Sequence, residues 1–239
     1  MSKFVVGIDK WLYPEYSEKN WDDTMFRKHI LEILRPQDVM LDLGAGAGII
    51  HQMNFRGLVG RVCGIDLDPR IVTQNRYLDE ALHGSAEAIP YPSSTFDLVI
   101  ANNVMEHIAD PHGVYREVYR VLKPGGRFLF KTPNKWHYMP LIARFTPLRF
   151  HQYINRIRGR STEDTFTTIY RANTPRQINQ LAKCSGLHVE YIELIEGRPE
   201  YTRLTGLTYL FGILYERIVN CVPGLSIFRI VMIGGLRKP

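Results

Sequence analysis

Short apolar runs alternate with stretches of helical periodicity along this chain. The first run, Val39–Leu43, is rich in large apolar residues and stops at a glycine-rich segment. A run of this length predicts a buried strand. Later runs, of which Ala81–His83 is the weakest, predict further strands at Arg61–Asp66, Ala81–His83, Phe96–Ala101, Arg127–Thr132, Leu187–Ile195 and Ile227–Ile233.

Helix signals fall between these runs. Asp22 or Asp23 can cap a helix that runs to about Leu34, and Pro69 is placed to open another helix after Asp66. Apolar spacing and breakers predict two more helices, at Val114–Leu122 and from Pro175 to Cys184. Alternating strands and helices predict an α/β fold with a doubly wound, mostly parallel, Rossmann-like sheet, which binds ligands beyond the carboxyl ends of its strands.

The segment after the first strand has three glycines at alternate positions, Gly44, Gly46 and Gly48. Strand, glycine-rich turn and helix in that order predict a nucleotide-binding turn, because glycine tolerates positive φ and lets a ligand approach the backbone. The third glycine of the dinucleotide fingerprint would fall at Ile49, so this pattern disfavours a nicotinamide dinucleotide. Asp66 closes the second predicted strand, where such folds hold ribose hydroxyls.

Composition and charge indicate the class of protein, its cellular location and its partners. The chain has 239 residues, of which 45% are hydrophobic and 23% charged, as expected for one globular domain. The first twenty residues show no signal-peptide pattern and no apolar run reaches membrane-spanning length, so we expect a cytoplasmic protein. The net charge of +6 permits an anionic substrate, a nucleic acid or a lipid surface as partner. We expect three buried, reduced thiols, at Cys63, Cys184 and Cys221.

Six ordered blocks make the pattern specific. They are Leu41-Asp42-Leu43-Gly44-Ala45-Gly46-Ala47-Gly48, Gly64-Ile65-Asp66, Ala86-Glu87-Ala88-Ile89-Pro90-Tyr91, Phe96-Asp97-Leu98-Val99, Val104-Met105-Glu106-His107-Ile108 and Val121-Leu122-Lys123-Pro124-Gly125-Gly126-Arg127. In this order and spacing, the chain resembles the class I S-adenosylmethionine-dependent methyltransferases, near the ubiquinone-pathway O-methyltransferases. The resemblance covers residues 38 to 134 strongly and the rest only in general layout.

The resemblance implies S-adenosyl-L-methionine as the cofactor and assigns residues to it. The three glycines would shape the turn that holds the methionine part, Asp66 would accept from both ribose hydroxyls, and Asn102 would lie beside the sulfonium. Ala86 would offer its amide to the adenine edge, next to Ser85, where the family often has an acid. The complete predicted set is Asp42, Gly44, Ala45, Gly46, Gly48, Asp66, Leu67, Ser85, Ala86, Glu87 and Asn102.

A sulfonium methyl group is already activated, so catalysis needs an aligned acceptor and, for a hydroxyl acceptor, a base. His107 is the favoured base and Glu106 the second catalytic candidate, because both follow the fourth predicted strand; local packing or capping is the alternative for each. His137, Tyr138 and His151 are further candidates after the fifth strand. Glu106, His107 and His112 lack a further regularly spaced ligand, so we expect no metal site.

The stretch from Pro133 to Thr174 interrupts the alternation with arginines and interleaved aromatic residues, as expected for either a lid over the acceptor or a solvated basic face. A second unusual stretch, Leu207 to Val219, is apolar except for Glu216-Arg217, and three interpretations remain: core, a dimer face, or docking on a membrane surface. We expect four parts in one domain: an N-terminal helical cap (1–36), the cofactor-binding core (37–134), the lid insertion (135–174) and the rest of the sheet (175–239).

The leading hypothesis is O-methylation of a small molecule or of a glycan or lipid-linked acceptor, by a monomer or homodimer. An RNA methyltransferase shares the fold and suits the charge, but the fourth strand ends in Asn102-Asn103-Val104-Met105 and lacks the signatures of base-methylating enzymes. The other alternative is an NAD(P)-dependent oxidoreductase, disfavoured by Ile49 and by the chain length.

Overall fold

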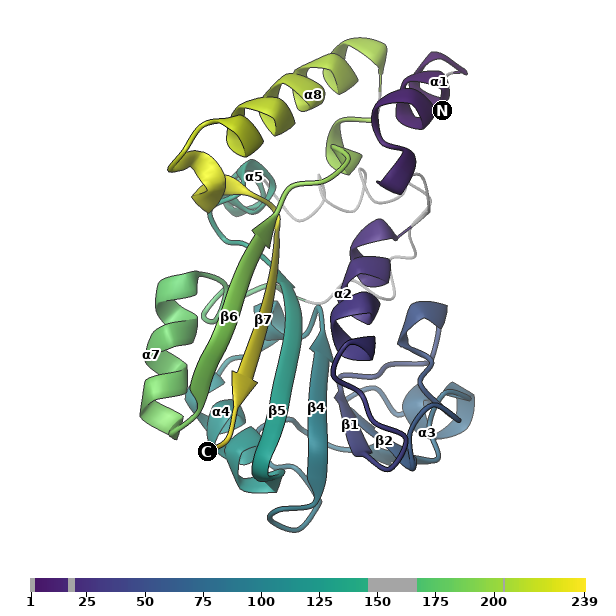
Figure 1. The fold of residues 1–239 in the computed structure, drawn as a ribbon, viewed down its shortest axis with the longest axis vertical. Coiled ribbons are helices and arrows are strands. Elements are labelled where there is room, and N and C mark those ends of the chain that lie inside the picture. The colour runs from purple at the N-terminus through teal and green to yellow at the C-terminus, as the bar shows by residue number, and fades with distance from the viewer. Residues whose placement is uncertain (1–2, 17–19, 146–166, 204) are drawn as a thin grey trace.

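The fold is built around one twisted sheet (Figure 1). A computed structural model describes residues 3–16, 20–145, 167–203 and 205–239. The strands are β1 (Val39–Leu43), β2 (Arg61–Asp66), β3 (Glu80–His83), β4 (Phe96–Asn102), β5 (Leu122–Pro133), β6 (His188–Ile195) and β7 (Val231–Arg237). The helices are α1 (Lys3–Leu12), α2 (Trp21–Leu31), α3 (Arg70–Gln74), α4 (Pro111–Val121), α5 (Tyr138–Phe145), α7 (Pro175–Ser185) and α8 (Gly206–Cys221).

The strand order is β3-β2-β1-β4-β5-β7-β6. The first five strands in this order are parallel to their neighbours, whereas β7 runs antiparallel to both β5 and β6. The predicted doubly wound, mostly parallel α/β sheet is therefore confirmed. Its order reverses at β1 and β4, and in such sheets ligands bind at that point, beyond the carboxyl ends of the strands.

Two apolar layers cover the two faces of the sheet. In β1, Leu41 and Leu43 point to the layer formed with α4 and α7, whereas Met40 points to the layer formed with α2. The alternation follows from the two-residue period of a strand. On the first face Val114, Val118, Val121 and Leu122 are all buried, as their spacing predicts. Both layers hold the strand ends rigidly in place.

The segment after the glycine turn corrects one prediction, because a short 3-10 turn (His51–Met53) stands where an α-helix was expected. Arg27 donates to the carbonyl oxygens of Gln52 and Asn54, at 2.5 and 2.8 Å, and so takes acceptors that a helix would use internally. Gly57, at φ 81°, then turns the chain toward β2. The amides that face the cofactor edge therefore belong to the glycine turn itself.

The N-terminal helix and the last strand also differ from prediction. Helix α2 begins after Asn20 and ends at Leu31, and neither Asp22 nor Asp23 caps it, because their carboxylates bind Lys131. Strand β7 begins at Val231, because the preceding residues 225–228 form a 3-10 turn.

The cysteines are only partly as predicted: all three are free thiols, but Cys184 and Cys221 are exposed and Cys63 alone is buried. Cys184 lies outside the buried stripe of α7, which consists of Ile178, Leu181 and Ala182. None of the described helices is both long and apolar enough to cross a bilayer.

Candidate cofactor and acceptor site

A cavity opens where the parallel strands reverse order, at the carboxyl ends of β1, β2 and β4. Seven of the eleven predicted cofactor residues line it: Asp42, Gly44, Ala45, Gly46, Gly48, Asp66 and Asn102. Further residues of the glycine turn and of the region around α3 complete the wall: Ala47, Ile49, Ile50, Met53, Asp68, Arg70, Gln74, Asn75 and Tyr77. This cavity is the candidate ligand site.

The glycine turn forms one wall of the cavity in a backbone conformation that needs glycine. Gly44, Gly46 and Gly48 have φ values of 70°, 55° and 73°. The Asn75 side chain fixes the turn, because its amide donates to the carbonyl oxygens of Ala45 and Gly46, both at 3.1 Å. A Cβ at Gly48 would lie 2.8 Å from Asn75 Oδ1, whereas a Cβ at Gly46 would meet no atom within 4 Å. The space beside Gly46 is therefore open.

Two carboxyl groups face the cavity with different partners. Asp66 accepts from the backbone N–H groups of Gly46 (2.8 Å) and Asp68 (2.7 Å), so it joins the glycine turn to the end of β2. Asp42 is 6% exposed, and burial together with the Asp66 charge raises the pKa of Asp42 to about 8. A cationic ligand would relieve this repulsion, so the pair favours positive charge in the cavity.

Asn102 places an unsatisfied acceptor in the cavity wall. Its Nδ2 donates to Asp23 Oδ1 at 2.9 Å, while its buried Oδ1 has no hydrogen-bond partner among the described residues. Asp23 in turn accepts from Lys131 Nζ at 2.5 Å. Because a buried carbonyl oxygen without a partner is costly, Asn102 Oδ1 fits a hydrogen-bond donor supplied by a ligand.

Lys131 anchors this arrangement from the neighbouring strand β5. Its side chain is 1% exposed and also binds Asp22 Oδ2 at 2.6 Å. Desolvation alone would raise the pKa of Asp22, but the Lys131 ammonium outweighs it and the pKa is lowered. The ion pairs therefore hold α2 against the cavity edge of the sheet.

The two catalytic candidates lie just beyond β4, in the 3-10 turn Met105–His107. Glu106 is 5% exposed and accepts from Thr132 Oγ1 at 2.9 Å, and Thr132 accepts from Asn173 Nδ2 at 2.7 Å. Burial raises the pKa of Glu106. This chain of hydrogen bonds connects the ends of β4 and β5 with the loop before α7.

His107 lies at the surface of the same edge, with its side chain 28% exposed. Its Nδ1 is 3.0 Å from the carbonyl oxygen of Thr167, and its Nε2 is 3.9 Å from Glu106 Oε1. A carbonyl oxygen only accepts, so Nδ1 carries a proton in this contact and the neutral ring has its lone pair on Nε2. The arrangement thus suits proton acceptance at Nε2, next to a carboxyl group.

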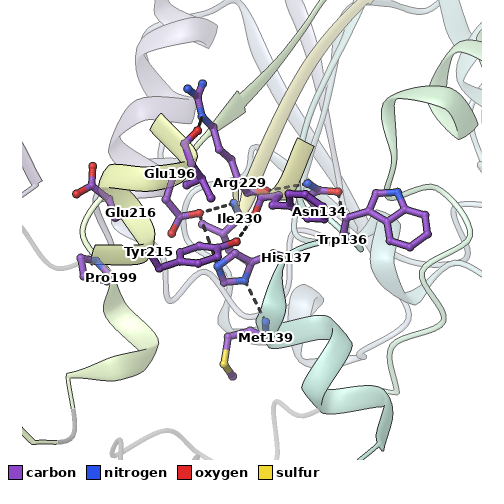
Figure 2. Close-up of polar contacts among 12 residues, drawn as sticks. Asn134, Trp136, His137, Met139, Glu196, Pro199, Tyr215, Glu216, Arg229 and Ile230 are labelled. Carbon is purple, nitrogen blue, oxygen red and sulfur yellow. Dashed lines mark hydrogen bonds and ion pairs between the residues drawn. The ribbon is translucent and has the colours of Figure 1, made fainter. Parts of the chain in front are cut away.

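The structure buries His137 in a packed cluster at the ends of β5, β6 and β7 (Figure 2). Its Nδ1 accepts from the N–H of Met139 at 3.2 Å, and its Nε2 is 3.6 Å from Glu196 Oε2. Glu196 also accepts from the N–H of Ile230 at 2.8 Å. His137 does not line the cavity, and its contacts are those of a packing residue.

Neither catalytic candidate, Glu106 or His107, lines the cavity, and the remaining predicted residues also lie away from its wall or outside the described part of the chain. Four predicted cofactor residues do not line the cavity but sit just after β2 and β3: Leu67, Ser85, Ala86 and Glu87. Ser85 Oγ accepts from the N–H of Glu87 at 3.1 Å. Tyr138 packs on His137 at the start of α5. His151 and the insertion's residues between 146 and 166, which carry most of its arginines, lie outside the described residues.

Sequence reasoning missed Asn75 and Lys131, although both shape the site. Asn75 belongs to no motif, and its only signal is an asparagine at a helix end, which is common. Lys131 lies in an apolar strand, where a lysine requires a charged partner, but that partner is 108 and 109 residues away in sequence. In the described part of the chain, no group of three or more His, Cys, Asp or Glu is placed to hold a metal ion.

Comparison with known proteins agrees with this geometry. Residues 41–130 match the family model described as a methyltransferase domain. The chain is 32% identical over 133 residues to a ubiquinone/menaquinone biosynthesis C-methyltransferase of Hydrogenovibrio crunogenus, an alignment that covers 50% of this chain and 52% of the relative. It is 31% identical over 165 residues to a ubiquinone biosynthesis O-methyltransferase of Pseudomonas putida, covering 64% of this chain and 66% of the relative. The chain thus spans about half to two thirds of these relatives.

Solved structures share the fold at low sequence identity. Geranyl diphosphate C-methyltransferase from Streptomyces coelicolor, solved with Mg²⁺, geranyl diphosphate and S-adenosyl-L-homocysteine, superposes with a TM-score of 0.56 at 18% identity, over 91% of this chain and 79% of that one. A Bacillus halodurans protein described as a methyltransferase gives a TM-score of 0.58 at 18% identity, over 91% and 99%. At this level of identity the superpositions show a shared fold.

Proposed function

Since the chain belongs to the class I S-adenosylmethionine-dependent methyltransferases, we propose that it methylates a hydroxyl group of a small-molecule acceptor. The observation that carries the proposal is the cavity at the strand reversal, where the glycine turn, Asp66 and Asn102 meet. Its relatives include both C- and O-methyltransferases. We favour oxygen because His107 offers a base, which a hydroxyl acceptor needs.

The residues present fit the cofactor. When bound, S-adenosylmethionine supplies a methyl group on a positively charged sulfur. Asp66 uses two of its lone pairs on backbone N–H groups and retains others for the two ribose hydroxyls. Asn102 Oδ1 is left to accept from a cofactor donor, and the Asp42–Asp66 pair favours its positive charge. Ser85 and Ala86, at the end of β3, would contact the adenine.

His107 would receive the acceptor's proton. With Nδ1–H held by the Thr167 carbonyl, the ring would take the proton at Nε2 and become an imidazolium beside Glu106. An ionised Glu106 would stabilise that cation, and its hydrogen bond from Thr132 keeps the carboxyl group in place. We also propose that residues 135–174, which follow β5, cover the acceptor. The domain would then have four parts: an N-terminal cap (1–36), the cofactor-binding core (37–134), this lid (135–174) and the rest of the sheet (175–239).

Calorimetric titration tests the cofactor assignment. We expect S-adenosylmethionine to bind and NADH not to bind. Asp66→Asn removes the charge from the ribose contact, about 1.5–3 kcal/mol, which weakens cofactor binding roughly 10- to 150-fold. The matched control is Asp97→Asn, because Asp97 also accepts a backbone N–H, from Val39 at 2.9 Å, but lies at the start of β4, away from the cavity. Binding of NADH alone, or an Asp66→Asn variant that titrates like the wild type, would refute the assignment.

Substitution of His107 tests the base. In His107→Gln, kcat should fall by about two to four orders of magnitude, with cofactor affinity unchanged. His112→Gln is the control, because His112 is an exposed histidine in the first turn of α4. If His107→Gln keeps the kcat of the wild type and of the His112→Gln control, His107 is not the base. Fragmentation of the methylated product in a mass spectrometer then identifies the methylated atom. If only RNA is methylated, the proposal of a small-molecule acceptor is wrong.

A further inference from the structure

Helix α8 has its polarity reversed relative to an ordinary surface helix. Its only acidic residue, Glu216, is 4% exposed and accepts from Tyr13 Oη at 2.8 Å and from Asn220 Nδ2 at 2.6 Å. Tyr209, which is fully buried, donates its hydroxyl to Asp9 of α1. Tyr215 donates to the carbonyl oxygen of Phe228 at 2.7 Å. These inward contacts fix the rotation of the helix about its axis.

The opposite face of α8 is apolar and exposed, which corrects the interpretation of this stretch as core. Its side chains recur at helical spacing and are 42 to 67% exposed: Leu207, Leu210, Phe211, Leu214 and Ile218. A stripe with this spacing normally faces a protein core. Here the buried polar contacts hold it outward, so it is a surface that the described residues leave uncovered.

The stripe lies at the acceptor end of the molecule. In Figure 1, α8 and α1 sit at the end toward which the arrows of β4 and β6 point, which is the edge that carries the cavity. Helix α1 packs against α8 through Val5, Tyr13 and Tyr209, and it carries Trp11 with 80% exposure. An exposed apolar surface thus borders the side from which an acceptor would arrive.

Charge and size favour an anionic lipid surface over a second copy of the chain. Each of the two helices contains a single acidic residue, Asp9 or Glu216, and both are buried. Arg217 lies beside the stripe, where its Nε is 3.4 Å from Glu216 Oε2 and its side chain is still about half exposed. A helix of 16 residues is about 24 Å long and about 10 Å wide. Its footprint of about 240 Å² is well below the roughly 800 Å² per partner of a stable protein interface.

We infer that α8 docks on the surface of an anionic phospholipid bilayer, with its axis in the membrane plane and its leucines and Phe211 in the acyl boundary. Interfacial helices bind in this way, by burial of an apolar face together with attraction between basic residues and acidic lipids. The docking does not depend on the proposed methyl transfer. If both hold, the acceptor edge faces the membrane, and the acceptor is an apolar molecule held there.

Vesicle sedimentation with the full chain tests the docking. The probe is a set of large vesicles of phosphatidylcholine with 30% phosphatidylglycerol, compared with pure phosphatidylcholine. The test variant is Phe211→Ser/Leu214→Ser, and the matched control is Leu58→Ser/Val72→Ser, in which two similarly exposed apolar residues outside α8 are replaced. We expect the wild type and the control to sediment with the anionic vesicles, and the test variant to partition at least tenfold less.

Two further measurements separate the outcomes. Thermal unfolding and cofactor titration should be unchanged in the test variant, because its substituted side chains are exposed and lie outside the cavity. A wild type that ignores anionic vesicles, or a test variant that binds them as well as the wild type, overturns the docking. Loss of a dimer in analytical ultracentrifugation of the variant, without any vesicle binding by the wild type, assigns the stripe to a second copy instead.

Discussion

The glycine turn gives the sharpest prediction, because two neighbouring glycines in the same backbone conformation differ in what surrounds them. Gly46→Ala and Gly48→Ala both place a side chain at positive φ, which costs about 1–2 kcal/mol. Only the new Cβ at Gly48 meets a neighbour, at 2.8 Å from Asn75 Oδ1 and 3.1 Å from its Cα. Relief requires Asn75 to move.

Movement of Asn75 would break its two hydrogen bonds to the turn, each worth about 0.5–1.5 kcal/mol. Gly48→Ala should therefore lose about 2–5 kcal/mol of unfolding free energy and Gly46→Ala about 1–2 kcal/mol. Urea denaturation measures both. In an Asn75→Ala background the extra cost of Gly48→Ala should shrink, since the clashing amide group and its two hydrogen bonds are already absent and only the 3.1 Å contact with the Cα of residue 75 remains.

Cofactor titration completes the test, because Gly46→Ala, the variant with the smaller loss of stability, should lose cofactor affinity. Its Cβ meets no protein atom within 4 Å and lines the cavity, so Gly46→Ala should weaken cofactor binding at least tenfold despite its small effect on stability. Equal stability losses in the two variants would contradict the role of Asn75. Wild-type affinity in Gly46→Ala would contradict the placement of the cofactor along the turn.

Two other predictions concern buried charges. The pKa of Asp42 in the folded protein, about 8, lies above its value in the unfolded chain. The unfolding free energy of the wild type should therefore fall as the pH rises from about 4 to 8 and then level off. Urea denaturation at each pH should show a shallower fall for Asp42→Asn. Lys131→Met leaves the buried Asp23 carboxylate and the partly exposed Asp22 carboxylate without their cation, and should lower the unfolding free energy by about 3–5 kcal/mol in urea denaturation. It should also weaken cofactor binding through Asn102, which donates to Asp23; an unchanged denaturation midpoint would contradict the anchoring of α2.

The strands and the glycine turn could be predicted because their signals are local. Apolar runs locate β1 to β4 and β6 to within one residue, whereas β5 begins at Leu122, five residues before its predicted start. The alternate glycines mark a turn whatever surrounds them. The end of the second predicted strand indicates Asp66, and the family resemblance then adds Asn102 at the end of the fourth. These features need no knowledge of distant contacts.

The rest depends on residues far apart in sequence. Asp22 and Asp23 could each cap a helix or bind a cation, and the local sequence does not distinguish the two roles. Lys131, more than a hundred residues away, binds both carboxylates and so determines the second role. The apolar spacing of α8 predicts a helix with a stripe, but the direction of the stripe is set by Tyr13 and Asp9, about two hundred residues earlier. Helical spacing predicts which side of a helix is apolar, but not whether that side contacts the core or the solvent.

The position of β7 has a consequence for synthesis of the protein. This strand is the last of the sheet in sequence, yet it lies between β5 and β6 and bonds to both. A nascent chain that has not yet released residues 231–237 from the ribosome has no partner for β6 and an open edge on β5. Completion of the sheet must therefore wait until residues 231–237 have left the ribosome, and until then the open edge of β5 is exposed to chaperones or to unwanted pairing.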